Sequence, residues 1–300
     1  MSTKNKVYIG PAGWFYKDWE GIVYPAIKAA GFDQLTYLSH LFNVIEINSS
    51  FYRPPALRSV KRWINKIKDN PEFTFTSKLW QEYTHQQNSF PGKTEEALVK
   101  QGLDELQKNN RLGALLIQFP WSFKNTPDNQ EWLEKIVAIF NEYHPVVEVR
   151  HQSWHEKSFL AFLDERKAGF ANIDQPAIGR SMPLTAYASK NLSYLRLHGR
   201  NVKNWFAQDA SVASRYDYLY QENELDEIKK KIEDLMENSP KTFIIFNNHF
   251  RGQAVANALQ TMFILTDNKV SVPQQLIKAY PQLKGISQPI SNTPEQTSLF

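Results

Sequence analysis

Residues 146–150 read VVEVR, an apolar run that ends in Glu148 and Arg150, two polar residues spaced two apart. The same arrangement occurs at 44–48, which reads VIEIN, and at 194–198, which reads YLRLH. Side chains two apart on a strand lie on the same face, so each stretch aims two polar groups in one direction from the end of a buried strand. Charged groups are costly to bury alone, and their repetition on three strands indicates that they converge on a ligand.

Apolar segments of strand length alternate with amphipathic segments along the chain. Eight strands are predicted, at 7–10, 44–47, 73–76, 114–119, 146–149, 169–173, 194–197 and 242–246. Seven helices are predicted, at 33–41, 57–68, 94–108, 129–143, 156–167, 224–237 and 252–265. Eight strands with helical crossovers predict a (β/α)8 TIM-type barrel. A doubly wound open sheet is the competing fold, but the sequence lacks its Gly-rich phosphate loop.

Composition limits the class of protein. The 300 residues contain no cysteine, which excludes disulfides, zinc-thiolate sites and a cysteine nucleophile. We find no apolar run long enough to span a bilayer and no long apolar segment before the first strand, so we expect a cytoplasmic protein without a membrane partner. The formal net charge of +4 permits an anionic partner but is too small for a dedicated nucleic-acid coat.

We expect one domain with a short extension. The barrel is predicted to occupy 1–265, and 266–300 is predicted to be a C-terminal extension that ends in a possible peptide motif, with 272–294 loosely held. The connection at 174–191 is rich in Pro, Gly and Ser and is expected to form an ordered loop on the catalytic face.

Polar residues stand at the carboxyl ends of almost all the predicted strands, where barrel enzymes carry their chemistry. They are Glu46, Asn48, Lys78, Gln118, Glu148, Arg150, Asp174, Arg196, His198, Asn247 and Asn248. Aromatic residues follow several of the same strands and could stack on a ligand ring: Trp14, Tyr16, Trp19, Phe51, Tyr52, Trp80, Trp121 and Trp154.

These motifs resemble the YecE-like family, the domain of unknown function numbered seventy-two. The matching segments are Gly13-Trp14-Phe15-Tyr16, Trp19, Gly21, Tyr24-Pro25, Glu46 to Tyr52, Lys78, Thr84-His85, Gln118-Phe119-Pro120, Glu148-Val149-Arg150, Ser153-Trp154, Asp174-Gln175-Pro176, Tyr194 to Arg200, Phe246-Asn247-Asn248, Gly252 and Asn257-Ala258. The match extends to about residue 260. It implies a (β/α)8 barrel but no settled reaction. One departure is Gly10-Pro11-Ala12-Gly13, where the family usually has Thr and Ser between the glycines.

The predicted site combines cations, imidazoles, carboxylates and amides, which suits an anionic, hydroxyl-bearing ligand such as a sugar phosphate, a nucleotide or nucleic acid. We predict an enzyme, a hydrolase or lyase of phosphate-containing substrates, with Glu46 or Glu148 as general base and His198 as acid or electrophile. The expected substrate-binding residues are Asn48, Tyr52, Lys78, His85, Gln118, Arg150, Trp154, Asp174, Arg196, Asn247 and Asn248.

Three alternatives stay open. The charges could form a structural network in which Glu46 pairs with Lys78. The protein could be a metal-dependent hydrolase, since carboxylates and histidines are metal ligands, but the nearby cations oppose a metal, so we predict no metal and no cofactor. It could also be a non-catalytic module that binds a small ligand or nucleic acid.

The last five residues, QTSLF, are a separate signal. They resemble the short peptide by which bacterial replication and repair proteins bind the DNA sliding clamp, with Gln296, Leu299 and Phe300 as the partner-binding residues and Thr297 in place of the usual Leu. A polar tether that ends in two large apolar side chains suits a groove on a partner.

Overall fold

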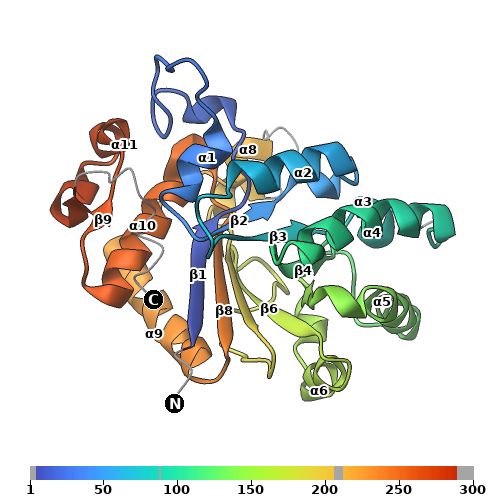
Figure 1. Cartoon of the computed structure of the whole chain (residues 1–300). Helices are drawn as coiled ribbons and strands as arrows, with labels where there is room; N and C mark the ends of the chain where they lie inside the picture. The colour runs from blue at the N-terminus through green and yellow to red at the C-terminus, as the bar shows by residue number, and fades with distance from the viewer. Residues whose placement is uncertain (1–4, 88, 206–211, 289–300) are drawn as a thin grey trace.

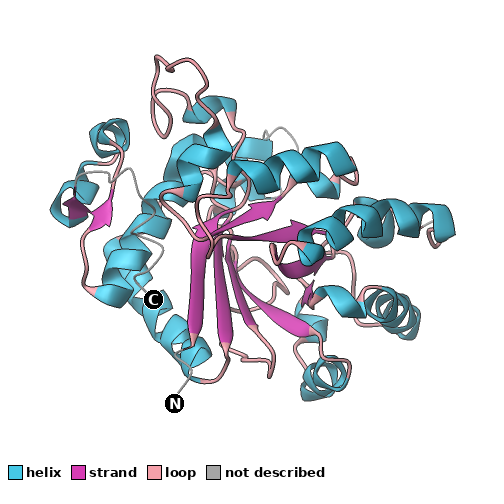
Figure 2. Ribbon diagram, in the orientation of Figure 1, coloured by secondary structure: helices cyan, strands magenta, loops and turns pink. Residues whose placement is uncertain are grey.

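Eight parallel strands form one sheet that curls into a barrel (Figures 1 and 2). The computed structural model describes residues 5–87, 89–205 and 212–288. The strand order is β1-β8-β7-β6-β5-β4-β3-β2. The strands are β1 (Lys6–Pro11), β2 (Val44–Ile47), β3 (Thr74–Lys78), β4 (Leu112–Gln118), β5 (Pro145–Glu148), β6 (Gly169–Asp174), β7 (Ser193–Leu197) and β8 (Lys241–Phe246). All eight predicted strands are present, and the (β/α)8 prediction is confirmed.

The barrel closes between β1 and β2 through a side chain. The Asn43 amide nitrogen donates to the Val7 carbonyl at 2.8 Å, and the Asn43 amide oxygen accepts from the Ile9 N–H at 2.9 Å. At the carboxyl end, the Gly13 N–H donates to the Glu46 carbonyl at 2.9 Å. Gly10 makes this closure possible, because a Cβ there would lie 1.9 Å from the carbonyl oxygen of Val44.

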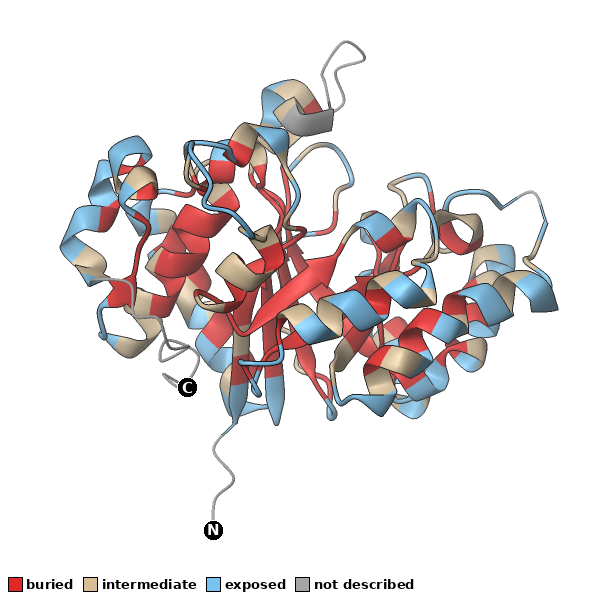
Figure 3. Cartoon of the chain, turned by 45° about the horizontal axis from the view of Figure 1, so that its top comes forward, coloured by how far each residue is buried: buried red, intermediate tan, exposed pale blue. Residues whose placement is uncertain are grey.

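Helices surround the barrel, and several of them bury an apolar face against it. The α-helices are α1 (Gln34–Ser39), α2 (Leu57–Lys66), α3 (Gln81–Thr84), α4 (Lys93–Lys108), α5 (Pro127–Ile139), α6 (Lys157–Glu165), α7 (Val202–Trp205), α8 (Val212–Arg215), α9 (Glu222–Glu237), α10 (Gln253–Thr266) and α11 (Gln274–Ala279). The 3-10 helices are η1 (Lys17–Trp19), η2 (Ser49–Phe51), η3 (Asn141–Tyr143), η4 (Gln152–Trp154), η5 (Phe250–Gly252) and η6 (Pro281–Ile286). In α9, Leu225, Ile228, Ile232 and Leu235 are the buried residues, which is the helical spacing of an amphipathic face. Figure 3 shows the strands as the buried centre and the exposed faces of the helices outside.

The connection between β6 and β7 runs without a helix, as its Pro, Gly and Ser content predicts. Its first part lies at the carboxyl end of the barrel, where Met182 N–H donates to the Arg150 carbonyl at 2.8 Å. Further along, the Ser189 hydroxyl accepts from the N–H of Phe170, near the start of β6. The segment therefore descends the outside of the barrel in place of a helix, and the expected catalytic-face loop is limited to its first part.

The C-terminal extension is packed rather than loosely held over the residues that the structure describes. It consists of β9 (Val270–Ser271), α11, η6 and β10 (Ser287–Gln288), with β9 and β10 paired in parallel. Leu276 and Leu283 are fully buried in the same apolar core as β1 and α10. The expectation of a loose segment from residue 272 is thus wrong as far as residue 288, because apolar side chains anchor it. Gln296, Leu299 and Phe300 lie outside the described residues.

Across the described ranges 5–87, 89–205 and 212–288, no helix is long and apolar enough to cross a membrane.

Candidate functional site

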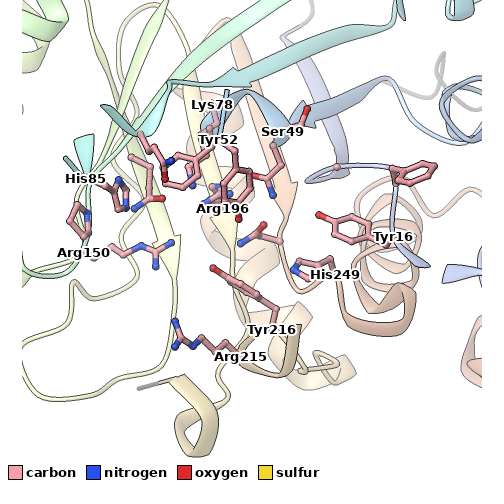
Figure 4. A pocket seen from close by; sticks show the side chains of 18 of the residues that line it. Tyr16, Ser49, Tyr52, Lys78, His85, Arg150, Arg196, Arg215, Tyr216 and His249 are labelled. Atoms are coloured by element: carbon pink, nitrogen blue, oxygen red, sulfur yellow. The ribbon is translucent and has the colours of Figure 1, made fainter. Parts of the chain in front are cut away.

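A cavity of about 740 Å³ lies at the carboxyl ends of the strands. Eight of the predicted site residues line it: Asn48, Tyr52, Lys78, His85, Gln118, Arg150, Arg196 and Asn247. Figure 4 shows His85 and Arg150 on one side of this pocket, Tyr16 and His249 on the other, and Lys78 and Arg196 between them. The alternation of the strands thus brings polar groups from distant parts of the sequence to one surface.

A buried ion-pair network forms the floor of the pocket, with Arg196 at its centre. Arg196 Nη2 lies 2.7 Å from Glu46 Oε1, and its Nε donates to Glu46 Oε2 at 3.1 Å. Its Nη1 donates to Glu148 Oε2 at 3.0 Å. Burial alone would lower the pKa of Arg196, but the two carboxylates raise it above its usual range. The main role of Arg196 is therefore structural, because its guanidinium group binds two buried carboxylates. This corrects its predicted role as a free anion-binding group.

Glu148 is held in its ionised form. Its Oε1 accepts from Arg150 Nε at 3.0 Å and lies 3.2 Å from His198 Nε2. Burial alone would raise the pKa of Glu148, but the charges of Arg196 and Arg150 and a hydrogen bond from His198 lower it well below its usual range. A carboxylate that binds two guanidinium groups is a poor proton acceptor at neutral pH.

Glu46 also accepts hydrogen bonds from buried side chains. Both of its oxygens bind Arg196, and Oε2 also accepts from the Tyr194 hydroxyl at 3.0 Å. Glu46 and Glu148 are fully buried below the residues that line the pocket. We therefore revise their predicted role as general base to that of holding Arg196 and Arg150 in position. The alternative pairing of Glu46 with Lys78 is also wrong, since Arg196 takes both oxygens.

His198 is buried and uncharged. Its Nδ1 lies 3.0 Å from the amide nitrogen of Asn247. The pKa of His198 is lowered to about 3, mainly by burial. The Glu148 carboxylate opposes this decrease, and the charge of Arg150 adds to it. A neutral imidazole below the pocket surface does not suit the predicted role of proton donor, so that assignment is corrected as well.

Lys78, the last residue of β3, has no carboxylate partner within ion-pair distance among the described residues. Its Nζ lies 3.7 Å from the centre of the Phe51 ring. Burial lowers the pKa of Lys78 to about 7, with a further decrease from Arg196 that Glu148 partly opposes. Lys78 therefore exchanges a proton near neutral pH while it lines the pocket.

Aromatic and imidazole rings form the wall opposite Lys78. The rings of Tyr16 and His249 are stacked, with centres 4.5 Å apart and planes at 11°. Tyr216 continues this wall, with its ring centre 5.1 Å from that of His249. Burial lowers the pKa of His249 to about 4, so it is neutral at pH 7. The wall offers flat, uncharged surfaces to a ring-containing ligand.

Comparison with known proteins places this architecture in a family. The family model described as "Protein of unknown function DUF72" matches residues 8–280. The chain belongs to the DUF72 family. The UPF0759 protein YunF of Bacillus subtilis (strain 168) is 30% identical over 273 residues, which cover 86% of this chain and 94% of that protein.

Solved structures of DUF72 proteins share the fold. A DUF72 protein from Thermotoga maritima MSB8 matches with a TM-score of 0.76 and 32% identity, over 87% of this chain and 99% of that one. A second, from Enterococcus faecalis V583, matches with a TM-score of 0.75 and 23% identity, over 86% of this chain and 95% of that one.

Three predicted site residues of this DUF72 protein are structural in the described geometry. The Trp154 indole is stacked on Phe123 and donates to its carbonyl at 2.8 Å. Asp174 binds Arg200 and accepts from the Tyr220 hydroxyl at 2.6 Å. Asn248 donates to the carbonyl of Tyr218 and to Asn257. None of Trp154, Asp174 and Asn248 is among the described residues that line the pocket.

Among the pocket residues that the sequence analysis missed are Trp205, Arg215, Tyr216 and His249. His249 directly follows Asn247 and Asn248, so the rule of polar groups at strand ends could have found it. Trp205, Arg215 and Tyr216 belong to the segment between β7 and β8, beyond the motif at the end of β7. Their mixture of aromatic and basic residues is the signal that was overlooked.

A metal site finds no support in the donor set. Among the residues that the structure describes, no three or more His, Asp or Glu side chains are grouped so that they could hold a metal ion. The carboxylates near the pocket, Glu46 and Glu148, are taken up by Arg196 and Arg150.

Proposed function

We propose that this DUF72 protein is a cytoplasmic enzyme that binds an anionic, phosphorylated or nucleotide-like substrate and transforms it by proton transfer, as a hydrolase or lyase. The observation that carries the proposal is the charge of the pocket. Lys78, Arg150 and Arg215 line it together with Arg196, whose charge Glu46 and Glu148 balance, whereas no Asp or Glu is found among its described lining residues. Such a surface attracts phosphate oxygens and repels cations.

The pocket divides between a basic and an aromatic part. Arg150, which the Glu148 carboxylate orients through Nε, presents its remaining N–H groups at the edge of the pocket. Arg215 adds a guanidinium group whose buried Nε has no hydrogen-bond partner among the described residues. The stacked rings of Tyr16 and His249 would contact a base or sugar ring. Lys78, with its pKa near 7, is the best placed proton-transfer group.

We expect Arg150→Ala to weaken the binding of inorganic pyrophosphate about 10- to 150-fold. This range corresponds to the loss of one charge-assisted hydrogen bond, about 1.5–3 kcal/mol. Isothermal titration calorimetry on the full chain measures the change.

Lys135→Ala is the matched control for this binding experiment. It removes one positive charge from α5, where Lys135 pairs with Glu131 on the outer surface. A full chain that does not bind pyrophosphate, or equal losses in the two variants, would contradict the proposal.

A second candidate function, a binding module recruited to the DNA sliding clamp, is supported by the sequence of the C-terminal tail. We expect a peptide ending in residues 295–300 to bind a bacterial clamp with an affinity of about tens of micromolar or weaker, because two buried apolar side chains contribute roughly 1.5–3 kcal/mol each before the ordering cost of the tail. Leu299→Ala together with Phe300→Ala should abolish binding in fluorescence anisotropy. A clamp that does not bind the unaltered peptide would reject this function.

A further inference from the structure

We propose that Lys78 is a nucleophile, whose amine forms an imine with the carbonyl carbon of an aldehyde or ketone that also carries the phosphate. This inference rests on the proposed function for the anion-binding part of the pocket. It adds a covalent step, a named residue and a carbonyl-bearing substrate class.

The surroundings of Lys78 differ from those of the lysines on the outside of the barrel. Lys6, Lys100 and Lys135 each form an ion pair with a glutamate. The Nζ of Lys78 instead lies on the apolar face of Phe51, with no hydrogen bond or ion pair to a described residue. An amine in this setting keeps its lone pair available whenever it is deprotonated.

The backbone fixes the position of Lys78 at the pocket. The hydroxyl of Ser50 donates to the Lys78 carbonyl at 2.7 Å. The next N–H, that of Leu79, donates to the carbonyl of Leu116 on β4 at 2.8 Å. Two neighbouring elements therefore hold the base of the side chain, which limits the freedom that a nucleophile must lose before it reacts.

The local charges favour the neutral amine. Burial is the largest cause that lowers the pKa of Lys78 to about 7, and Arg196 lowers it further. A much larger fraction of the Lys78 side chains is then neutral at pH 7 than is the case for an ordinary lysine. The guanidinium groups of the site thus have two effects. They attract the phosphate of the substrate, and they favour the neutral, reactive form of the Lys78 amine.

The reaction balances without an oxidant or a reductant. The lone pair of Nζ forms a bond to the carbonyl carbon, and the π electrons of the C=O bond move to oxygen. Proton transfer from nitrogen to oxygen gives a carbinolamine, which takes up one further proton from solvent and loses water. The product is a protonated imine, which withdraws electrons from the adjacent carbon and so assists cleavage or proton removal there, the chemistry of a lyase.

The test is reductive trapping on the full chain. Glyceraldehyde 3-phosphate and sodium borohydride are added, and labelled peptides are identified by mass spectrometry. We expect labelling of Lys78 in preference to Lys93, whose side chain is 92% exposed. Labelling should increase as the pH rises through about 7 and decrease when pyrophosphate is present. Glyceraldehyde, which lacks the phosphate, should label Lys78 at least about tenfold less, as expected for one lost charge-assisted contact.

Two variants separate chemistry from folding. Lys78→Arg keeps the positive charge but cannot form the imine, so the label should disappear from a chain that circular dichroism shows to be folded. Lys78→Met controls for loss of the charge. If pyrophosphate binds but Lys78 is labelled no more than Lys93, the imine is rejected and the proposed function stands. If Lys78 is labelled equally by both aldehydes without protection by pyrophosphate, the phosphorylated substrate is rejected together with the proposed function.

Discussion

Arg196→Ala is expected to lower the free energy of unfolding by about 3–5 kcal/mol, the range for removing one partner of a buried ion pair. Arg196 is 1% exposed and supplies three hydrogen bonds to Glu46 and Glu148. Without it, Glu46 keeps the Tyr194 hydroxyl and Glu148 keeps Arg150 as hydrogen-bond donors. Two buried carboxylates then face each other with too little positive charge.

Urea unfolding of the full chain, followed by tryptophan fluorescence, measures this loss. Arg150→Ala is the matched control, because its side chain is 15% exposed and Glu148 would still have Arg196. We expect its effect on stability to be less than half as large, while its effect on pyrophosphate binding is strong. An Arg196→Ala protein with unchanged stability would show that the network is not part of the folded core.

Gly10→Ala is expected to destabilise the protein by about 3 kcal/mol or more, at the upper end of the range for overpacking. The new Cβ would lie 1.9 Å from the Val44 carbonyl oxygen, which is a backbone atom that no rotamer change can move. Strand β1 must then move away from β2. Just after β1, the Gly13 N–H donates to the Glu46 carbonyl on β2. A movement of β1 would therefore also move the floor of the pocket, to which Glu46 belongs.

The same urea experiment, with pyrophosphate titration on the folded fraction, measures both consequences. Gly285→Ala is the matched control: a Cβ there meets no atom within 4 Å, and we expect a change within about 0.5 kcal/mol. A Gly10→Ala protein as stable as the Gly285→Ala protein would mean that β1 and β2 adjust without strain.

The buried ion pairs and the pocket cations Lys78 and Arg150 lie at different depths in this barrel. The carboxylates and Arg196 lie in the buried layer, where their charges neutralise one another. Lys78 and Arg150 lie one layer higher, at the pocket. The buried carboxylates orient Arg150, and Arg196 helps to keep Lys78 partly neutral. The network is thus both part of the core and a source of the electrostatic properties of the site.

The sequence alone was sufficient for the fold and for most of the pocket lining. Local patterns set strand and helix positions, since apolar periodicity depends only on neighbouring residues. The parallel barrel then places every strand's carboxyl end at one rim, so strand-end position by itself assigns Lys78, Arg150 and Asn247 to one surface.

Only the tertiary structure decided which of those groups face a ligand and which face each other. Glu46, Glu148 and Arg196 meet across the barrel from β2, β5 and β7, and the distances between them depend on strand register and closure. The spacing of residues within one strand does not indicate how deeply a side chain is buried in the barrel or which residues of other strands it contacts. The same holds for His249, whose ring contacts those of Tyr16 and Tyr216 from a different loop. The physical reason is that pairing and burial are set by contacts distant in sequence, whereas strand-end polarity is set by contacts near in sequence.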